Sequence, residues 1–403
     1  MMDLLKTTTL TVISLSIGTG GPLPCHGQNI DDASVFRLFN KEITEPAPEP
    51  DTVSFVFLGD IMLHSAQIAN ASEKFTGPDR SDTTGHYSFD FSQYFSDIQE
   101  YISAADLAVA NMEFTLGGPP FTGYPAFSAP DGYARYMAEC GIDVFLTANN
   151  HILDKGAQGA VRTLNVYTGL KEEFGTRYTG TGTGPVEFSE TNPLIVDIGG
   201  LKAALVNFTY GTNAYVHEEY PRVNRTDKGQ LLRQFRKAEE SRADIIIALP
   251  HWGEEYSLLH SAHQYLMAEW LAENGADIII GTHPHVVQDS TVITVRRGQF
   301  SGKKVPVIFS LGNAISNMSA RDTQTGLLAK VCAVKHLNGK VEIFPIEFTY
   351  LWCSLPGRLK DTHCTIPVKK YLSRPGMWRM QYEYDKMLDS YTRVKTATGI
   401  KDQ

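Results

Sequence analysis

Short apolar runs alternate with segments of helical period along most of this chain, and no other feature limits its fold as strongly. Strands that are apolar throughout, rather than at every second position, are typical of parallel sheets covered by helices. The helical segments between them predict βα units, and therefore an α/β fold. The predicted strands lie within residues 52–60, 107–111, 142–150, 244–252, 276–283 and 305–313.

Two stretches depart from this rhythm and predict antiparallel strands as well. Residues 193–210 place a Gly-Gly pair at 199–200 between two apolar runs, and residues 327–352 place an Asn-Gly pair at 338–339 in the same way. Such pairs are typical of tight hairpin turns, because they adopt positive φ at little cost. We expect a β-hairpin in each stretch.

The first 27 residues have the layout of a secretory signal, with cleavage expected after Gly27. A lysine precedes a short apolar stretch, and small residues follow it. That stretch is about half of the roughly 20 residues that a membrane-spanning helix needs, and no other segment approaches this length. We therefore expect an exported protein of the periplasm or cell surface, without a transmembrane segment after cleavage. A lipid anchor at Cys25 is the alternative.

Composition divides the rest of the chain into three parts. Residues 28–50 end in a stretch rich in proline and glutamate, which predicts a linker. Residues 51–355 contain the predicted strands and form the main domain. Residues 356–403 are polar, basic and aromatic, and predict a C-terminal helical extension with a solvated face.

The charge of the chain argues against nucleic acid as a partner. The formal net charge is −9, so the chain lacks the excess of positive charge that binds a phosphate backbone. The same charge repels anionic substrates at long range, so a bound anion needs a local source of positive charge. A metal ion would supply it.

The five cysteines show neither a CxxC pair nor a zinc-finger spacing. In an exported chain, Cys353 and Cys364 have two equal interpretations, as a disulfide or as free buried thiols.

Polar side chains follow five of the predicted strands at their carboxyl ends, the edge where open α/β sheets bind ligands. His283 and His285 are the strongest signal, because imidazoles one residue apart point to the same face and suit a shared cation. Taken alone, Asp60 has the interpretation of a turn or helix cap, and His251 that of a hydrogen-bonded, partly buried residue. Their common position favours a metal centre.

The ligand types at these positions narrow the choice of metal. Oxygen and imidazole ligands without thiolates suit zinc, manganese or iron, and exclude a structural cysteine zinc site. We expect two divalent ions roughly 3.5–4 Å apart with Glu113 between them, where a water loses its proton near pH 7. The metal-capable side chains that follow the five strands are Asp60, His64, Asn111, Glu113, Asn149, Asn150, His151, Asp154, His251, His283 and His285.

Six motifs follow one another along the chain, namely GDIML (59–63), NMEF (111–114), TANNHILDKG (147–156), HWGEEY (251–256), GTHPHVVQ (281–288) and FSLGNAIS (309–316). Taken in order, they resemble the CapA (poly-γ-glutamate synthesis, PGA_cap) family of capsule-synthesis proteins, within the calcineurin-like metallophosphatase superfamily. The resemblance covers roughly residues 53–320 and implies a four-layer αββα sandwich. It also implies a role in making or processing a capsule or poly-γ-glutamate polymer. The metal ligands that the resemblance implies are Asp60, His64, Glu113, Asn150, His251, His283 and His285.

The first two motifs differ from the superfamily pattern. Asp60 matches the aspartate of Asp-x-His, but Met62 stands where the histidine is usual, and His64 is expected to replace it. Glu113 stands in place of the bridging aspartate and has a longer side chain.

The later motifs match with smaller changes. The resemblance implies that Asn150 binds metal and that His151 acts as the acid or stabilises charge. Asp154 is expected to orient His151 or to cap the helix from Gly156. The other family histidines are matched, with one inserted residue in the last motif, by His251, His283 and His285.

We expect a metal-dependent hydrolase in which a metal-held hydroxide attacks a phosphoester or a γ-glutamyl bond of an anionic polymer, while His151 assists the leaving group. The residues expected to contact substrate are Asn111, Trp252, Glu255, Tyr256 and Asn313. The alternative for Trp252 is a role in packing, and the alternative for Asn313 is a role in a turn.

The missing Asp-x-His histidine supports a different class of protein. In that alternative the chain is a non-catalytic accessory that keeps its metal and binds capsular polyanion or capsule-synthesis proteins. A nucleotide or nucleic-acid phosphoesterase is a third class, which the net charge and the expected export disfavour.

Overall fold

The computed structural model describes residues 52–74 and 89–402 of the chain. The signal predicted at 1–27, the linker at 28–50 and Cys25 lie outside the described residues and stay predictions. Among the described helices, none has the length and apolar character that crossing a membrane requires.

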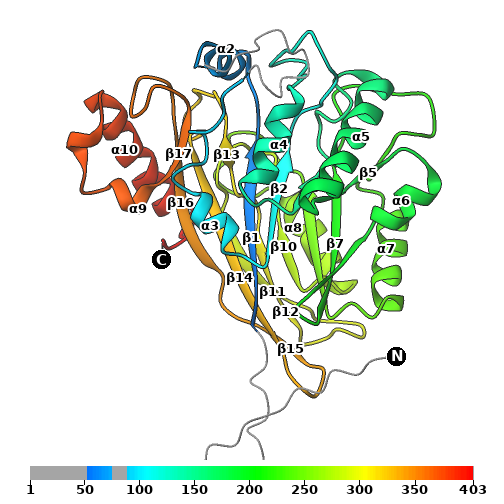
Figure 1. Ribbon diagram of the computed structural model, residues 1–403. Coiled ribbons are helices and arrows are strands. Elements are labelled where there is room, and N and C mark those ends of the chain that lie inside the picture. Colours follow the sequence, from blue (N-terminus) through cyan, green and yellow to red (C-terminus); the bar gives the residue numbers. More distant parts are fainter. Residues whose placement is uncertain (1–51, 75–88, 403) are drawn as a thin grey trace, which may run out of the picture. The chain divides into compact units, whose positions relative to one another are not determined.

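Nine strands form the first sheet, which combines parallel and antiparallel pairs (Figure 1). Four successive parallel strands build one half, namely β1 (Thr52–Ile61), β2 (Leu107–Met112), β3 (Val144–Leu146) and β4 (Arg177–Thr179). On the other side of β1 lie β13 (Asn313–Ile315), β14 (Thr325–Lys335), β15 (Val341–Ile343), β16 (Glu347–Ser354) and β17 (Cys364–Pro367).

Six strands form the second sheet, with four parallel strands in the middle and an antiparallel strand at each edge. The parallel strands are β7 (Leu201–Thr209), β9 (Ile245–His251), β10 (Ile278–Ile280) and β12 (Lys304–Ile308). The edge strands are β6 (Leu194–Ile198) and β11 (Ser290–Thr294), and a separate short pair joins β5 (Thr181–Gly182) to β8 (Arg222–Val223).

The helices connect these strands, and several have clear local start and stop signals. Ser261 and Gln264 form a capping box at the start of α8, and Gly175 ends α5 in the left-handed conformation. The helices are α2 (Ser65–Lys74), α3 (Gln99–Ser103), α4 (Asp131–Glu139), α5 (Gly156–Phe174), α6 (Pro185–Thr191), α7 (Lys228–Glu240), α8 (Ala262–Glu273), α9 (Val368–Tyr371) and α10 (Gln381–Thr398).

The core explains why the strands are apolar on both faces. In β1, Phe55 and Phe57 face the second sheet, whereas Val56 and Leu58 face helices α3, α4 and α5. A third cluster packs the far face of the second sheet against α7 and α8. The packing order is therefore helices, sheet, sheet and helices. The predicted α/β fold is confirmed.

Both predicted hairpins are present. Strands β6 and β7 pair antiparallel across residues 199–200, and β14 and β15 pair antiparallel across residues 338–339. Gly199, Gly200 and Gly339 all have positive φ, a conformation that glycine adopts at little cost because it has no Cβ.

The described C-terminal residues belong to the same compact unit as the main sheets. Strand β17 pairs with β16, so it extends the first sheet beyond residue 355. Helix α10 is attached by buried polar contacts, because Gln324 donates to Glu383 at 2.9 Å and Arg393 donates to Asp322 at 3.1 Å.

Of the two interpretations of the cysteines, the structure gives free buried thiols for Cys353 and Cys364. Cys353 lies opposite Thr365 in the pairing of β16 with β17, and Cys364 lies opposite Ser354. Because neighbouring positions on a strand point to opposite faces of a sheet, the two sulfur atoms belong to different core clusters.

Candidate metal centre

Side chains from both sheets meet at the carboxyl ends of the parallel strands. The first sheet supplies Asp60 from β1 and Glu113 from the residue after β2. The second sheet supplies His251, the last residue of β9, and the loop after β10 supplies His283 and His285. A hydrogen bond of 3.2 Å from the His283 backbone N–H to Asp60 Oδ2 joins the two sides.

These five residues form two groups that are able to hold a metal ion, and they share one member. Group one consists of Asp60, Glu113 and His285, and group two of Glu113, His251 and His283. Within each group the ligand atoms lie within 4.8 Å of one another. The position of Glu113 in both groups is that of a carboxylate able to bridge two ions.

The two histidines one residue apart belong to different groups. His285 belongs to group one and His283 to group two, and their ring centroids lie 6.0 Å apart. Both residues have positive φ, at 102° and 58°. Such strain in residues other than glycine clusters at functional sites.

Unpaired buried atoms show that the site fits a cation. Within the described residues, Glu113 Oε1 and His283 Nδ1 are buried without a hydrogen-bond partner. Leaving such atoms unpaired costs about 1–3 kcal/mol each, which coordination to an ion would offset. Carboxylate oxygens and imidazole nitrogens are the donor set of zinc, manganese and iron.

Neighbouring amides orient the carboxylates. Asn111 Nδ2 donates to Asp60 Oδ1 at 2.7 Å and to Glu113 Oε2 at 3.2 Å. Asn149 Nδ2 in turn donates to Asn111 Oδ1 at 3.1 Å. Asn111 was expected to contact substrate, and its complete burial gives it an orienting position instead.

Asn313 holds His285 in a similar way. Its Oδ1 lies 3.1 Å from His285 Nδ1, and its Nδ2 donates to the Thr323 carbonyl at 2.9 Å. The amide thus fixes the ring so that Nε2 faces Glu113, whose Oε1 is 3.7 Å away. Support of this kind sets the orientation of a metal-binding histidine.

Burial separates the pKa values of the two carboxyl groups. Burial, and next the charge of Asp60, raises the pKa of Glu113 well above its usual range. Although burial opposes it, hydrogen bonding to His285 lowers the pKa of Asp60. Without a cation, the site therefore keeps one carboxylate charged and disfavours the second.

The histidine pKa values also diverge. Burial, followed by the neighbouring histidines, lowers the pKa of His283 to about 3 and that of His251 well below its usual value. Burial has the same direction of effect on His285, but hydrogen bonding to Asp60 overcomes it and raises its pKa. His251 and His283 are consequently neutral at pH 7, which is the form that binds metal.

Asn150 and His151 lie beside group two. Asn150 Oδ1 is 2.9 Å from His251 Nε2, so the amide oxygen is within reach of an ion held by that group. His151 Nδ1 lies 2.7 Å from Asp154 Oδ2, which also accepts the Phe127 N–H at 2.8 Å. Lys155, not Asp154, is the N-cap of α5, so of the two roles predicted for Asp154 the structure shows the contact to His151.

His64 lies outside both groups. Its Nδ1 accepts the Asn317 N–H at 3.2 Å and lies 3.2 Å from Gln67 Oε1, at the start of α2. Its ring also packs edge-on against Phe127, with centroids 5.3 Å apart. The structure therefore does not bring His64 together with the other six predicted ligands.

Asn317 links His64 to His363, which provides a test of acid stability. His363 is fully buried and its Nε2 lies 2.8 Å from Asn317 Oδ1. Burial, and then the charge of His64, lowers the pKa of His363 to about 3 from an ordinary value of 6.5. The folded state therefore binds fewer protons than the unfolded state between these pH values, and acid destabilises the fold.

We expect the free energy of unfolding to fall by about 3 kcal/mol between pH 7 and pH 4 through this one histidine. Urea unfolding of the metal-free protein at several pH values measures the fall, and the His363→Gln variant should show a correspondingly shallower slope. The partly exposed His336, whose Nε2 lies 3.0 Å from Glu342 Oε2, gives the control variant His336→Gln. Parallel curves for wild type and His363→Gln would contradict the assignment.

The remaining predicted substrate residues surround the groups. Trp252 is buried and its Nε1 donates to the Phe309 carbonyl at 3.0 Å, so packing is part of its role. Glu255 and Tyr256 are exposed at the rim. The Tyr256 backbone N–H donates at 2.9 Å to the carbonyl of Pro284, between the two histidines.

Sequence reasoning missed two residues from the loop after β7. The ring of Tyr210 lies 4.6 Å from that of His283, and Asn213 Nδ2 lies 3.4 Å from both ring nitrogens of His151. Tyr210 directly follows an apolar run that was interpreted as a hairpin strand, so its position at the carboxyl end of that run was the signal that could have found it. Asn213 lies further into the loop and belongs to no motif.

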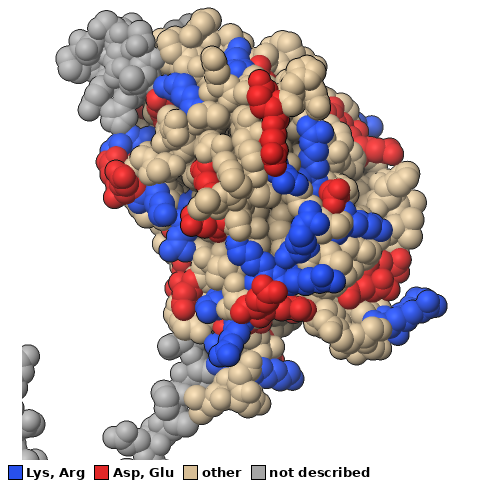
Figure 2. Space-filling view, turned by 90° about the vertical axis from the view of Figure 1, so that its right-hand side faces the viewer, with Lys and Arg blue, Asp and Glu red and all other residues tan. Residues whose placement is uncertain are grey.

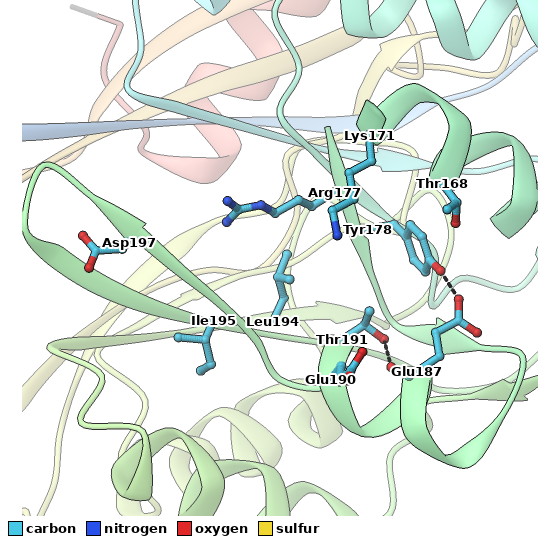
Figure 3. A pocket seen from close by; sticks show the side chains of 10 residues that line it. All are labelled: Thr168, Lys171, Arg177, Tyr178, Glu187, Glu190, Thr191, Leu194, Ile195 and Asp197. Atoms are coloured by element: carbon cyan, nitrogen blue, oxygen red, sulfur yellow. Dashed lines mark hydrogen bonds between the residues drawn. The ribbon is translucent and has the colours of Figure 1, made fainter. Parts of the chain in front are cut away.

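A cavity of about 550 Å³ lies away from the metal-capable groups, between α5, β4, α6 and β6 (Figure 3). Lys171 and Arg177 on its wall oppose acidic residues, one of which, Glu187, is held by Tyr178 and by the Thr183 N–H at 2.6 Å. Figure 2 shows the same mixture of both charges over one face of the molecule. No predicted site residue lines this cavity.

Comparison with known proteins gives a family and two relatives. Residues 54–318 match the model of the family described as bacterial capsule synthesis protein PGA_cap. The capsule biosynthesis protein CapA of Bacillus anthracis is 26% identical over 70% of this chain and 64% of that protein. The PGA biosynthesis protein CapA of Bacillus subtilis (strain 168) is 24% identical over 74% of this chain and 72% of that protein.

Solved structures give more distant likenesses. The NAD nucleotidase NadN of Haemophilus influenzae has a TM-score of 0.42 and 12% identity, over 86% of this chain and 63% of that chain. The 5'-nucleotidase precursor of Thermus thermophilus has a TM-score of 0.41 and 13% identity, over 86% of this chain and 59% of that chain.

Proposed function

This chain belongs to the bacterial capsule synthesis protein PGA_cap family, and from that premise we propose that it is an exported, metal-dependent hydrolase of the cell envelope. The proposal includes two divalent ions, manganese, zinc or iron, one in each group. It also includes a phosphoester as the bond that is cleaved during synthesis or processing of capsule polymer.

The observation that carries this proposal is the shared position of Glu113. A carboxylate common to two buried metal-capable groups is the arrangement of two-metal hydrolases. A structural site, in contrast, needs one ion with closed coordination. A protein that kept a single structural ion would not need two adjacent metal-capable groups around one carboxylate.

Each described residue then has a defined task. Bound ions would polarise a phosphoryl oxygen and lower the pKa of a bound water. Asp60, Glu113 and His285 would hold one ion, and Glu113, His251 and His283 would hold the other, with the Asn150 amide oxygen nearby. His151, oriented by Asp154, lies beside group two and is positioned to donate a proton to the leaving group.

A γ-glutamyl bond of an anionic polymer is the second candidate for cleavage, and the name of the Bacillus subtilis relative, a PGA biosynthesis protein, favours it. The rim of the site argues against cleavage of an anionic polymer, because the Glu255 carboxylate is exposed there. Burial, and next the charge of Glu255, raises the pKa of Tyr256. A negatively charged rim repels a polyanion.

Metal analysis together with turnover tests the proposal. After purification, loading with manganese or zinc and dialysis, we expect two ions per chain and hydrolysis of bis(p-nitrophenyl) phosphate. A chelator should abolish the turnover and re-addition of the ion should restore it. Hydrolysis of γ-glutamyl p-nitroanilide instead would favour the second candidate.

One tightly held ion without turnover on either compound would contradict the hydrolase. That result would favour the accessory protein that binds capsular polyanion or synthesis partners.

A further inference from the structure

A small cavity borders the metal-capable groups on the side of the second sheet. Its volume is about 220 Å³. Trp252 in its wall directly follows His251, and Tyr210 in its wall contacts the ring of His283 at a centroid distance of 4.6 Å. Tyr210 therefore both lines the cavity and contacts group two.

The lining combines aromatic faces with neutral polar groups. Tyr210 and Trp252 supply the rings, while Thr226, Ser261 and His263 supply hydroxyl and imidazole groups. Among the described residues that line the cavity, none is lysine or arginine, and the charged group present is the Glu254 carboxylate. An anionic group placed here would meet a like charge without compensation.

The floor of the cavity is held in place before any ligand arrives. Gln264 Oε1 accepts the Ser261 N–H at 2.9 Å, and its Nε2 donates to Gln288 Oε1 at 2.8 Å. Gly253 has a φ of +100°, and a Cβ there would lie 2.5 Å from Gln264 Nε2. A wall fixed in this way loses little freedom on binding.

These features select the chemistry of the occupant. A sugar ring presents apolar C–H faces and a circumference of hydroxyl groups, which match aromatic walls and scattered polar groups. The volume is below the roughly 300 Å³ of a cavity for a drug-sized ligand, so it suits a single ring. We propose that this cavity binds an uncharged sugar ring of the substrate, an inference that rests on the proposed phosphoester hydrolysis.

The test uses the full chain loaded with manganese and two phosphomonoesters that differ in the sugar. We expect wild type to have a kcat/KM about 10-fold higher for glucose 1-phosphate than for glycerol 1-phosphate. His263→Ala should lower the value for glucose 1-phosphate by about 3- to 10-fold and leave that for glycerol 1-phosphate within about 2-fold. The exposed Tyr215→Ala, whose ring contacts His217, is the matched control.

Binding of methyl α-D-glucopyranoside, followed by ligand-observed NMR, is independent of turnover. We expect binding to wild type and Tyr215→Ala and its loss in Tyr210→Ala. Equal losses on both esters, no loss on either, or failure to bind the glucoside would overturn the sugar site, as would preferential binding of adenosine. If neither ester is cleaved but the glucoside binds as described, the hydrolase proposal fails and the sugar site stands.

Discussion

The Glu113→Gln variant is expected to lose its bound metal and to hydrolyse phosphoester at least about 100-fold more slowly, while its fold remains intact. Substituting a residue that only hydrogen-bonds to a metal ligand already lowers metal affinity or activity by about 10- to 100-fold. Glu113 belongs to both metal-capable groups, so we expect its loss to have at least this effect. Glutamine keeps the shape of the side chain and an oxygen that accepts from Asn111. It cannot supply the charged bridge.

The metal-free variant supplies the second half of this prediction. Burial, and then Asp60, already raises the pKa of Glu113 well above its usual range, so glutamine resembles the form that the empty site favours. We expect the metal-free free energy of unfolding to change by less than about 1 kcal/mol. Metal at 100 times its Kd should stabilise wild type by about 2.7 kcal/mol and the variant by far less.

Metal content by elemental analysis, thermal unfolding with and without manganese, and turnover on one preparation together measure these effects. Glu347→Gln makes the same substitution at an exposed position of β16 and should match wild type in all three. Unchanged metal content in Glu113→Gln would contradict the bridging role.

The strand pattern predicted the fold because burial acts on the sequence directly. β1 is apolar at successive positions since Phe55 and Phe57 face one cluster while Val56 and Leu58 face another. Hairpin turns were equally visible, because positive φ restricts the choice of residue. The edge strand β17 was missed, since its four residues carry no alternation and depend on pairing with β16.

Some residues of the candidate site were predictable from the sequence for the same reason, and others were not. Asp60, Glu113 and His251 were predictable because each lies at the carboxyl end of a strand, where the sheet fixes its position. The path of a loop is set by side-chain and backbone contacts that the strand pattern does not encode. The backbone N–H of Asn317 and the side chain of Gln67 hold His64 away from the groups, and positive φ at His283 turns its ring toward group two.

Replacing His151 by alanine is expected to preserve the metal content and to lower turnover by about 10²- to 10⁴-fold, the range for loss of a general acid. His151 is buried, lies outside both metal-capable groups, and has its Nδ1 2.7 Å from Asp154 Oδ2. Loss of turnover with metal retained separates this variant from Glu113→Gln. His260→Ala, which removes another histidine paired with an aspartate, is the control.

The leaving group distinguishes proton donation from a purely structural role of His151. A p-nitrophenolate leaves without a proton, whereas an alkoxide needs one, so His151→Ala should slow an alkyl phosphoester more than a p-nitrophenyl ester. Asp154→Asn should show the same preference with a smaller loss, because the imidazole remains but its orienting carboxylate is gone. If the two esters are slowed equally, His151 is not the proton donor. The effect of His151→Ala would then not depend on whether the leaving group needs a proton.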